Sequence, residues 1–76
     1  MNKEEFVQNI ANQFDETDPS LFKTDTEFKQ LDEWSSLIAL SIIAMADESY
    51  NVKLKGDDIR NSRTINDLFE VVNSRL

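Results

Sequence analysis

The stretch LDEWSSLIALSIIAMADESY, residues 31–50, decides the fold of this 76-residue chain. Its apolar residues from Ser36 to Tyr50 recur at helical spacing, which predicts an amphipathic helix directly after a pair of serines. Ser is a favoured helix N-cap, so either Ser35 or Ser36 could cap this helix. The predicted core face consists of Ala39, Ile42, Ile43, Ala46 and Tyr50, with Ile38 and Met45 at its edge.

The opposite side of the same helix mixes polar and apolar residues. Its polar members are Ser36, Ser41, Asp47 and Glu48, and among them lie Leu37, Leu40 and Ala44. Large apolar side chains outside the core stripe often mark a contact surface, which favours Leu37 and Leu40 as part of a partner-binding face. The alternative is that the long preceding segment folds over these two leucines and covers them.

Toward the N-terminus, the pattern predicts a first helix and then a long loop. The helix should run from Asn2 to Phe14, with Asn2 as its cap and Glu5 completing a capping-box-like pattern. Its buried stripe is Phe6, Val7, Ile10, Ala11 and Phe14. From Asp15 to Ser35 no periodicity is sustained, and Pro19 breaks any helix. We expect this loop to be tied down by Leu21, Phe22, Phe28, Leu31 and Trp34.

A calcium-binding loop beginning at Asp15 was one candidate site in this segment. An EF-hand needs Gly at its sixth position and Glu at its twelfth, where this chain has Ser20 and Thr26. Its fifth position would be Pro19. The sequence therefore excludes an EF-hand here.

Toward the C-terminus, residues 51–56 read as a loop whose Val52 and Leu54 point inward. Residues 57–61 predict one short helical turn, and Thr64, with Asp67 three residues on, should open the last helix. That helix should bury Ile65, Leu68, Phe69 and Val72. The prediction is a single all-α domain over residues 1–76, a small four-helix bundle with three main helices, one short helix and a long first loop.

The composition excludes several classes of function. Eight basic and fifteen acidic residues give a net charge of −7, which disfavours nucleic acid and anionic lipid and favours basic partners. With no Cys and no His, the chain cannot form a disulfide, a CxxC metal site or a Ser-His-Asp triad. The sequence shows no signal peptide and no stretch of about 20 apolar residues, so we expect a cytoplasmic protein without a membrane span. We also expect it to be a monomer.

Enzymatic function has weak support in this sequence. Asp47, Glu48, Asp57 and Asp58 could in principle supply a two-carboxylate hydrolase, but acid clusters on helices are far more often solvated faces. The only glycine is Gly56, so there is no Gly-rich phosphate loop. A Ser at the mouth of a helix, in a chain without a thiol, indicates a carrier and not an enzyme.

The residues around Ser36 resemble the acyl carrier proteins, the phosphopantetheine-binding four-helix type. Ser35-Ser36-Leu37 occupies the place of the family's Asp-Ser-Leu motif, and residues 37–50 resemble the family's second helix, which ends in an acidic pair and an aromatic residue. Val52-Lys53-Leu54 matches the inward alternation that follows, and residues 64–68 resemble the opening of the last helix. The resemblance covers nearly the whole chain and is strongest from Leu31 to Val72.

This resemblance implies that Ser36 carries 4′-phosphopantetheine, transferred from coenzyme A by a separate phosphopantetheinyl transferase. Acyl groups would ride on the arm as thioesters, for delivery to acyl-transferring or ketosynthase-type enzymes with basic patches. The pathway would be fatty-acid-like synthesis or a specialised lipid, polyketide or surface-polysaccharide pathway. The partner-binding residues would be Leu37, Leu40, Ser41, Ala44, Asp47 and Glu48.

Two departures from the family pattern stand out. Ser35 replaces the family's Asp, which helps the transferase and its metal recognise the site, and we expect Asp32 and Glu33 to compensate. Ile38 and Ser41 stand where acids are frequent, which favours a specialised pathway. The alternative function is an unmodified helical adaptor that binds a partner through Leu37 and Leu40.

Overall fold

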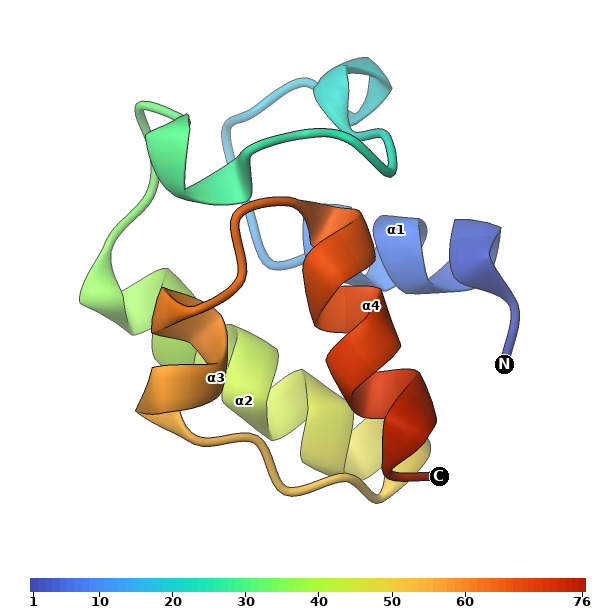
Figure 1. Ribbon diagram of the computed structural model, residues 1–76. Coiled ribbons are helices and arrows are strands. Elements are labelled where there is room, and N and C mark those ends of the chain that lie inside the picture. The colour runs from blue at the N-terminus through green and yellow to red at the C-terminus, as the bar shows by residue number, and fades with distance from the viewer.

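The computed structural model describes all 76 residues and is entirely helical (Figure 1). Four α-helices follow one another: α1 (Lys3–Ala11), α2 (Ser36–Tyr50), α3 (Gly56–Arg60) and α4 (Ile65–Ser74). Two short 3₁₀ turns, η1 (Pro19–Leu21) and η2 (Phe28–Gln30), interrupt the long α1–α2 connection. The predicted small helical bundle of three longer helices and one short one is confirmed. None of its helices is both long and apolar enough to cross a bilayer.

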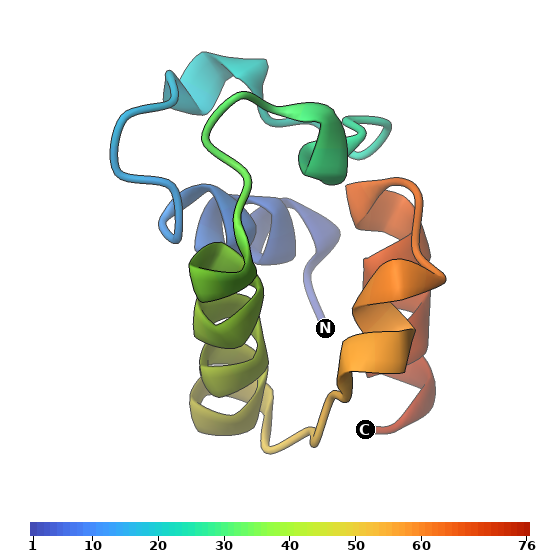
Figure 2. The same ribbon diagram turned by 90° about the vertical axis from the view of Figure 1, so that its left-hand side faces the viewer.

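The helices lie on two sides of the hydrophobic core. Figure 2 shows α2 on one side and α3 with α4 on the other, while the long connection arches over their upper ends. That connection is fastened to the start of α4, because the carbonyl oxygens of Thr24 and Thr26 accept hydrogen bonds from the backbone N–H groups of Asn66 and Ile65. Two of the N–H groups that a helix leaves free at its start are thereby satisfied.

The predicted cap residues Asn2 and Thr64 are confirmed, but Glu5 does not complete a capping box, because its side chain makes no hydrogen bond back to Asn2. Asn2 Oδ1 accepts a hydrogen bond from Glu5 N at 3.0 Å. Thr64 Oγ1 accepts from Asp67 N at 3.1 Å, while Asp67 Oδ2 accepts from Thr64 N at 3.0 Å, which completes a capping box. The predicted end of the first helix at Phe14 is wrong, because the chain tightens after Ala11 into bonds between residues three apart.

The end of α2 redirects the chain into the core. Asn51 adopts a left-handed conformation, with φ 56° and ψ 39°, which Asn tolerates better than most residues. Its N–H and that of Val52 donate to carbonyl groups of the last turn of α2. The reversal brings Val52 and Leu54 into the interior, as predicted, with 2% and 5% of their surface exposed.

The core contains eighteen buried apolar residues drawn from every part of the chain. Phe6 of α1 contacts Tyr50 of α2 and Phe69 of α4, with ring centroids 5.9 and 5.6 Å apart. On α2 the predicted core face is confirmed with a slight rotation. Ile38 and Met45, expected at its edge, are buried, whereas Ala39 and Ile43 are only partly so.

The long connection is held by aromatic packing. Phe14, Phe22, Phe28 and Trp34 form a chain of ring contacts with centroids 5.0 to 6.4 Å apart. The prediction that apolar residues tie this segment down is confirmed for Phe22, Phe28, Leu31 and Trp34. It is wrong for Leu21, which is 56% exposed because the inward position at the end of η1 belongs to Phe22.

Candidate functional site at the start of helix α2

The two adjacent serines at the start of α2 do different things. Ser35 has extended backbone angles, and its Oγ accepts a hydrogen bond from Ile38 N at 3.4 Å, so Ser35 is the N-cap. Ser36 is the first residue of the helix, is exposed, and makes no side-chain hydrogen bond within the protein. Of the two hydroxyls, that of Ser36 is therefore the one left free for chemistry.

The surroundings of Ser36 favour an anion. It begins a helix of fifteen residues whose first turn contains no acidic side chain. The aligned peptide dipoles and unpaired N–H groups of such a helix place partial positive charge at this end. A phosphate group attached at Ser36 would be stabilised there.

Glu33, three residues before Ser36, is committed to the long connection. Its carboxylate accepts hydrogen bonds from Thr17 Oγ1 at 2.6 Å, Asp15 N at 2.7 Å and Glu16 N at 3.0 Å. The Thr17 hydroxyl is the main cause that lowers the pKa of Glu33 below its usual value, with the two backbone N–H groups adding to it. Glu33 thus connects residues 15–17 to the segment that directly precedes α2.

The role of Glu33 was missed by sequence reasoning, which expected Asp32 and Glu33 to stand in for the family's Asp. Because the Glu33 carboxylate is already engaged, only Asp32 is exposed and free of hydrogen bonds. No spacing rule pairs an acid with backbone N–H groups 17 and 18 residues earlier, so the pattern offered no signal. Trp34 adds a second tether, because its ring packs against Phe14 and Phe28.

The predicted partner face is open to solvent. Leu37 is 72% exposed and Leu40 is 62% exposed, so the alternative that the long connection covers them is wrong. Ala44 and Glu48 are also exposed, and Ser41 is half-buried. The structure therefore places the seven predicted site residues along one side of α2.

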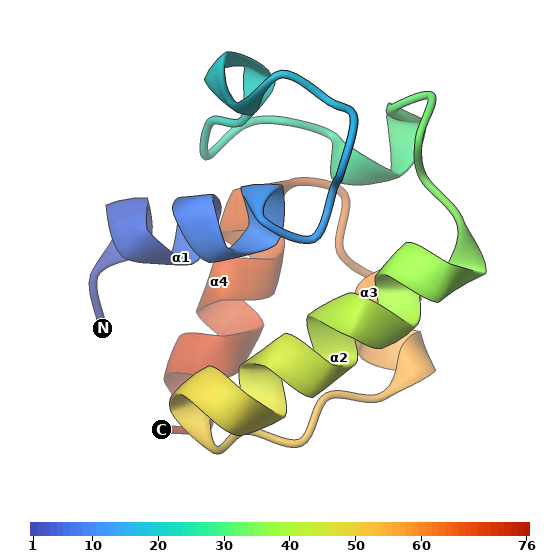
Figure 3. The same cartoon turned by 180° about the vertical axis from the view of Figure 1, so that it is seen from behind.

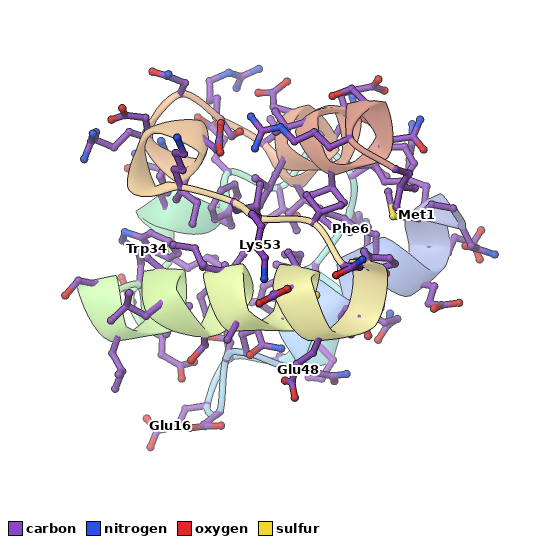
Figure 4. The ribbon with its side chains drawn as sticks, turned by 90° about the horizontal axis from the view of Figure 1, so that it is seen from below. Met1, Phe6, Glu16, Trp34, Glu48 and Lys53 are labelled. Carbon is purple, nitrogen blue, oxygen red and sulfur yellow. The ribbon has the colours of Figure 1, made fainter.

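The two acids at the far end of this face differ. Both Asp47 carboxylate oxygens accept hydrogen bonds from Lys53 Nζ, at 2.7 and 2.8 Å, whereas Glu48 forms no ion pair. Figure 4 shows Glu48 and Lys53 on opposite sides of α2, with Trp34 near its start. Only Glu48 therefore offers an uncompensated charge to a partner.

The carboxylates considered for hydrolysis are mostly engaged elsewhere. Besides the Asp47–Lys53 pair, Asp57 pairs with Arg60, and Asp58 accepts a bidentate contact from Arg75 at 2.8 Å. The hydrogen bond from Arg75 is the main cause that lowers the pKa of Asp58. No group of three acidic side chains is placed to hold a metal ion.

Comparisons with protein-family models, with curated protein sequences and with solved structures found no match to this chain.

Proposed function

We propose that this chain is a stand-alone acyl carrier protein that bears 4′-phosphopantetheine on Ser36. The observation that carries the proposal is the free, exposed hydroxyl of Ser36 at the first position of a long helix, beside two exposed leucines. The family resemblance places the attachment serine at this same position. In this role the protein would work as a cytoplasmic monomer that enzymes visit in turn.

The residues present fit the phosphopantetheine group. Ser36 Oγ has no protein hydrogen bond to give up, and the phosphodiester would lie at the positive end of α2. When bound, the arm supplies a terminal thiol, which this Cys-free chain lacks and which can hold acyl groups as thioesters. In the loading reaction Ser36 Oγ loses its proton, bonds to the β-phosphate of coenzyme A, and displaces the adenosine-bearing phosphate.

The other site residues position Ser36 and present it to partners. Ser35 caps α2, and Glu33 holds the preceding segment, so the serine stands on a fixed frame. Leu37 and Leu40 supply apolar contact, and Glu48 attracts basic residues of the transferase and of acyl-transferring enzymes. Because one carrier must visit several enzymes, we expect small interfaces whose association weakens with salt.

The loading reaction tests this proposal. Incubation with coenzyme A, magnesium and a broad-specificity transferase should add one phosphopantetheine, detected by intact mass. Ser36→Ala should abolish the addition, and Ser35→Ala should retain it. Ser35→Asp should load at least as fast as the parent, since it restores the acid of the family motif. Modification that persists in Ser36→Ala would move the site to Ser35.

The alternative adaptor function has one observation in its favour, the exposed Leu37 and Leu40. An adaptor would use these leucines without any change at Ser36. The intact mass of the protein purified from its native host separates the two functions. An added arm supports the carrier, and an unmodified chain supports the adaptor.

A further inference from the structure

A small hollow of about 260 Å³ lies between the long connection and the end of α3. Figure 3 shows the link from α3 to α4 rising behind α2 to the underside of the long connection, where η2 lies. The hollow is lined by seven polar or charged residues and by no apolar one: Glu27, Lys29, Gln30, Arg60, Asn61, Ser62 and Arg63. Its lining therefore suits a polar or charged group.

This hollow has the opposite charge to the molecule as a whole. Its lining includes three basic residues and one acid, whereas the chain has a net charge of −7. In each of the other three hollows, acids outnumber bases in the lining. The three basic residues come from η2, from the last residue of α3 and from the link that follows it. The fold thus gathers cations from three segments at one place.

Contacts within the protein hold the three cations around the hollow. Lys29 Nζ donates a hydrogen bond to the carbonyl oxygen of Arg60 at 2.8 Å, which joins η2 to the end of α3. The Arg60 guanidinium pairs with Asp57, and that of Arg63 pairs with Glu27 at 3.4 Å. The two arginine side chains are still 74% and 72% exposed. Because a guanidinium has five N–H donors, most of them stay available after one contact with a carboxylate.

We propose that this hollow is a docking site for an acidic segment of a partner protein. A guanidinium forms a planar fork that binds a carboxylate through two parallel hydrogen bonds, and Lys29 adds a third positive charge. Gln30 and Asn61 are exposed, and their side-chain amides have no hydrogen bond within the protein, so they offer further donors. A segment with several carboxylates can bind these groups together without breaking either internal ion pair.

The docking site is separate from the partner face of α2. None of its lining residues belongs to α2, and Figure 2 shows α2 on the opposite side of the core from α3 and α4. The two surfaces also select opposite charges, because the α2 face offers the carboxylate of Glu48 to basic groups. An acidic segment can therefore stay bound while the start of α2 remains open to another protein. This inference holds whether or not Ser36 is modified.

NMR titration of the unmodified protein with hexaglutamate tests the docking site. The signals of Arg60, Asn61 and Arg63 should shift in a saturable way, while those of Leu37 and Leu40 should not move. Inorganic phosphate at equal total charge should shift the same three residues less than half as far. Shifts with phosphate as large as those with hexaglutamate would assign the hollow to a small anion and overturn the acidic segment. The absence of any saturable shift would also overturn it.

Matched charge variants locate the binding. The double variant Arg60→Gln and Arg63→Gln should weaken hexaglutamate binding at least about fivefold, because two charged donors are lost. The double variant Lys23→Gln and Lys53→Gln removes the same charge from exposed positions elsewhere, and should weaken binding less than about twofold. All four side chains are exposed, and circular dichroism checks that both variants fold. Equal weakening in the two variants would mean that hexaglutamate responds to net charge alone, which would overturn the site.

Loading by the transferase shows whether the docking site is separate. The variant with Arg60→Gln and Arg63→Gln should be loaded at a rate within about twofold of the parent, because the hollow shares no residue with the α2 face. A rate that falls as far as in Leu40→Ala would place the hollow in the transferase interface and overturn its separate role. If the parent is never loaded, the carrier function fails, and the hexaglutamate titration still decides the docking site.

Discussion

Glu33, Ser35 and Ser36 lie within four residues of one another, and each has a different task. Glu33 ties down residues 15–17, Ser35 satisfies an N–H group at the start of α2, and Ser36 keeps a free hydroxyl. Two Ser residues in sequence are chemically identical, so only the backbone conformation decides between them. The extended angles of Ser35 make it the cap and so leave its neighbour available.

The hydrogen bonds that Glu33 accepts from residues 15–17 should be detectable in the titration of its carboxyl group. Because Thr17 Oγ1 is the main cause of the lowered pKa, Thr17→Val should raise the pKa of Glu33 toward its ordinary value. The tether stabilises the fold at neutral pH, and this contribution is lost as the pH falls through the lowered pKa. Carboxyl ¹³C NMR measures the shift. Thr24→Val is the control, since its hydroxyl makes no bond to Glu33, and equal pKa values in both variants would contradict the assignment.

The different roles of Ser35 and Ser36 should also change the free energy of unfolding to different extents. Ser35→Ala removes the cap and should lower the free energy of unfolding by about 0.5–1 kcal/mol, the lower part of the usual range because the bond is 3.4 Å long. Ser36→Ala should change it by less than about 0.5 kcal/mol. Urea denaturation of both variants measures the difference. A larger loss for Ser36→Ala would show that the cap assignment is wrong.

At the scale of the helix, one face of α2 packs into the core and the other is exposed to solvent. Ile42 is fully buried, so Ile42→Ala should destabilise the bundle by about 2–5 kcal/mol. Leu40→Ala should cost less than about 0.5 kcal/mol, because its side chain is mostly solvated, yet it should slow loading by the transferase. Thermal unfolding beside the transferase rate checks both variants. The opposite pattern would mean that the partner face is misplaced.

The helices and their caps could be predicted because their signals are local. Each signal spans only a few residues of sequence. This holds for the apolar repeats that bury Phe6, Ile42 and Leu68, and for the Thr64 cap with its Asp67 partner. Features that depend on distant contacts were missed. The bonds from residues 15–17 to Glu33 belong to this group, because periodicity does not say which loops meet.

The partner face was also only partly readable from the sequence. The spacing identified the exposed Leu37 and Leu40, because a solvent-facing side of a helix follows from its period. It could not show that Lys53 folds back onto Asp47, since that contact requires the reversal at Asn51. The two neighbouring acids therefore looked equivalent in the sequence and differ in the structure.

Over the whole molecule, charge opposes the compact state. Four of the fifteen acids form ion pairs, with Lys53, Arg60, Arg63 and Arg75, so eleven carboxylates have no such partner. The Arg75 guanidinium also donates to the Lys53 carbonyl oxygen at 3.2 Å, which fastens the end of α4 to the segment before α3. Most of the surface charge is nevertheless negative, and the unpaired carboxylates repel one another.

Salt should therefore stabilise this protein at neutral pH. The molecule measures 29 × 23 × 20 Å, which is smaller than the Debye length of about 30 Å at 0.01 M salt. All of its charges then interact across the whole body, whereas at 0.15 M the length falls to about 8 Å and only neighbours interact. The four ion pairs are weakened as well, but exposed pairs contribute little.

We expect the melting temperature to rise by roughly 4–8 °C between 0.01 and 0.15 M NaCl, which corresponds to about 1 kcal/mol in a domain of this size. The matched control is the double variant Glu4→Gln and Glu16→Gln, which removes two exposed, unpaired charges, one in α1 and one in the long connection. Its melting temperature at low salt should already be higher, and its rise with salt should be smaller. Calorimetry at both salt concentrations gives the comparison. An equal rise in parent and variant would mean that salt acts through general solvation and not through repulsion among carboxylates.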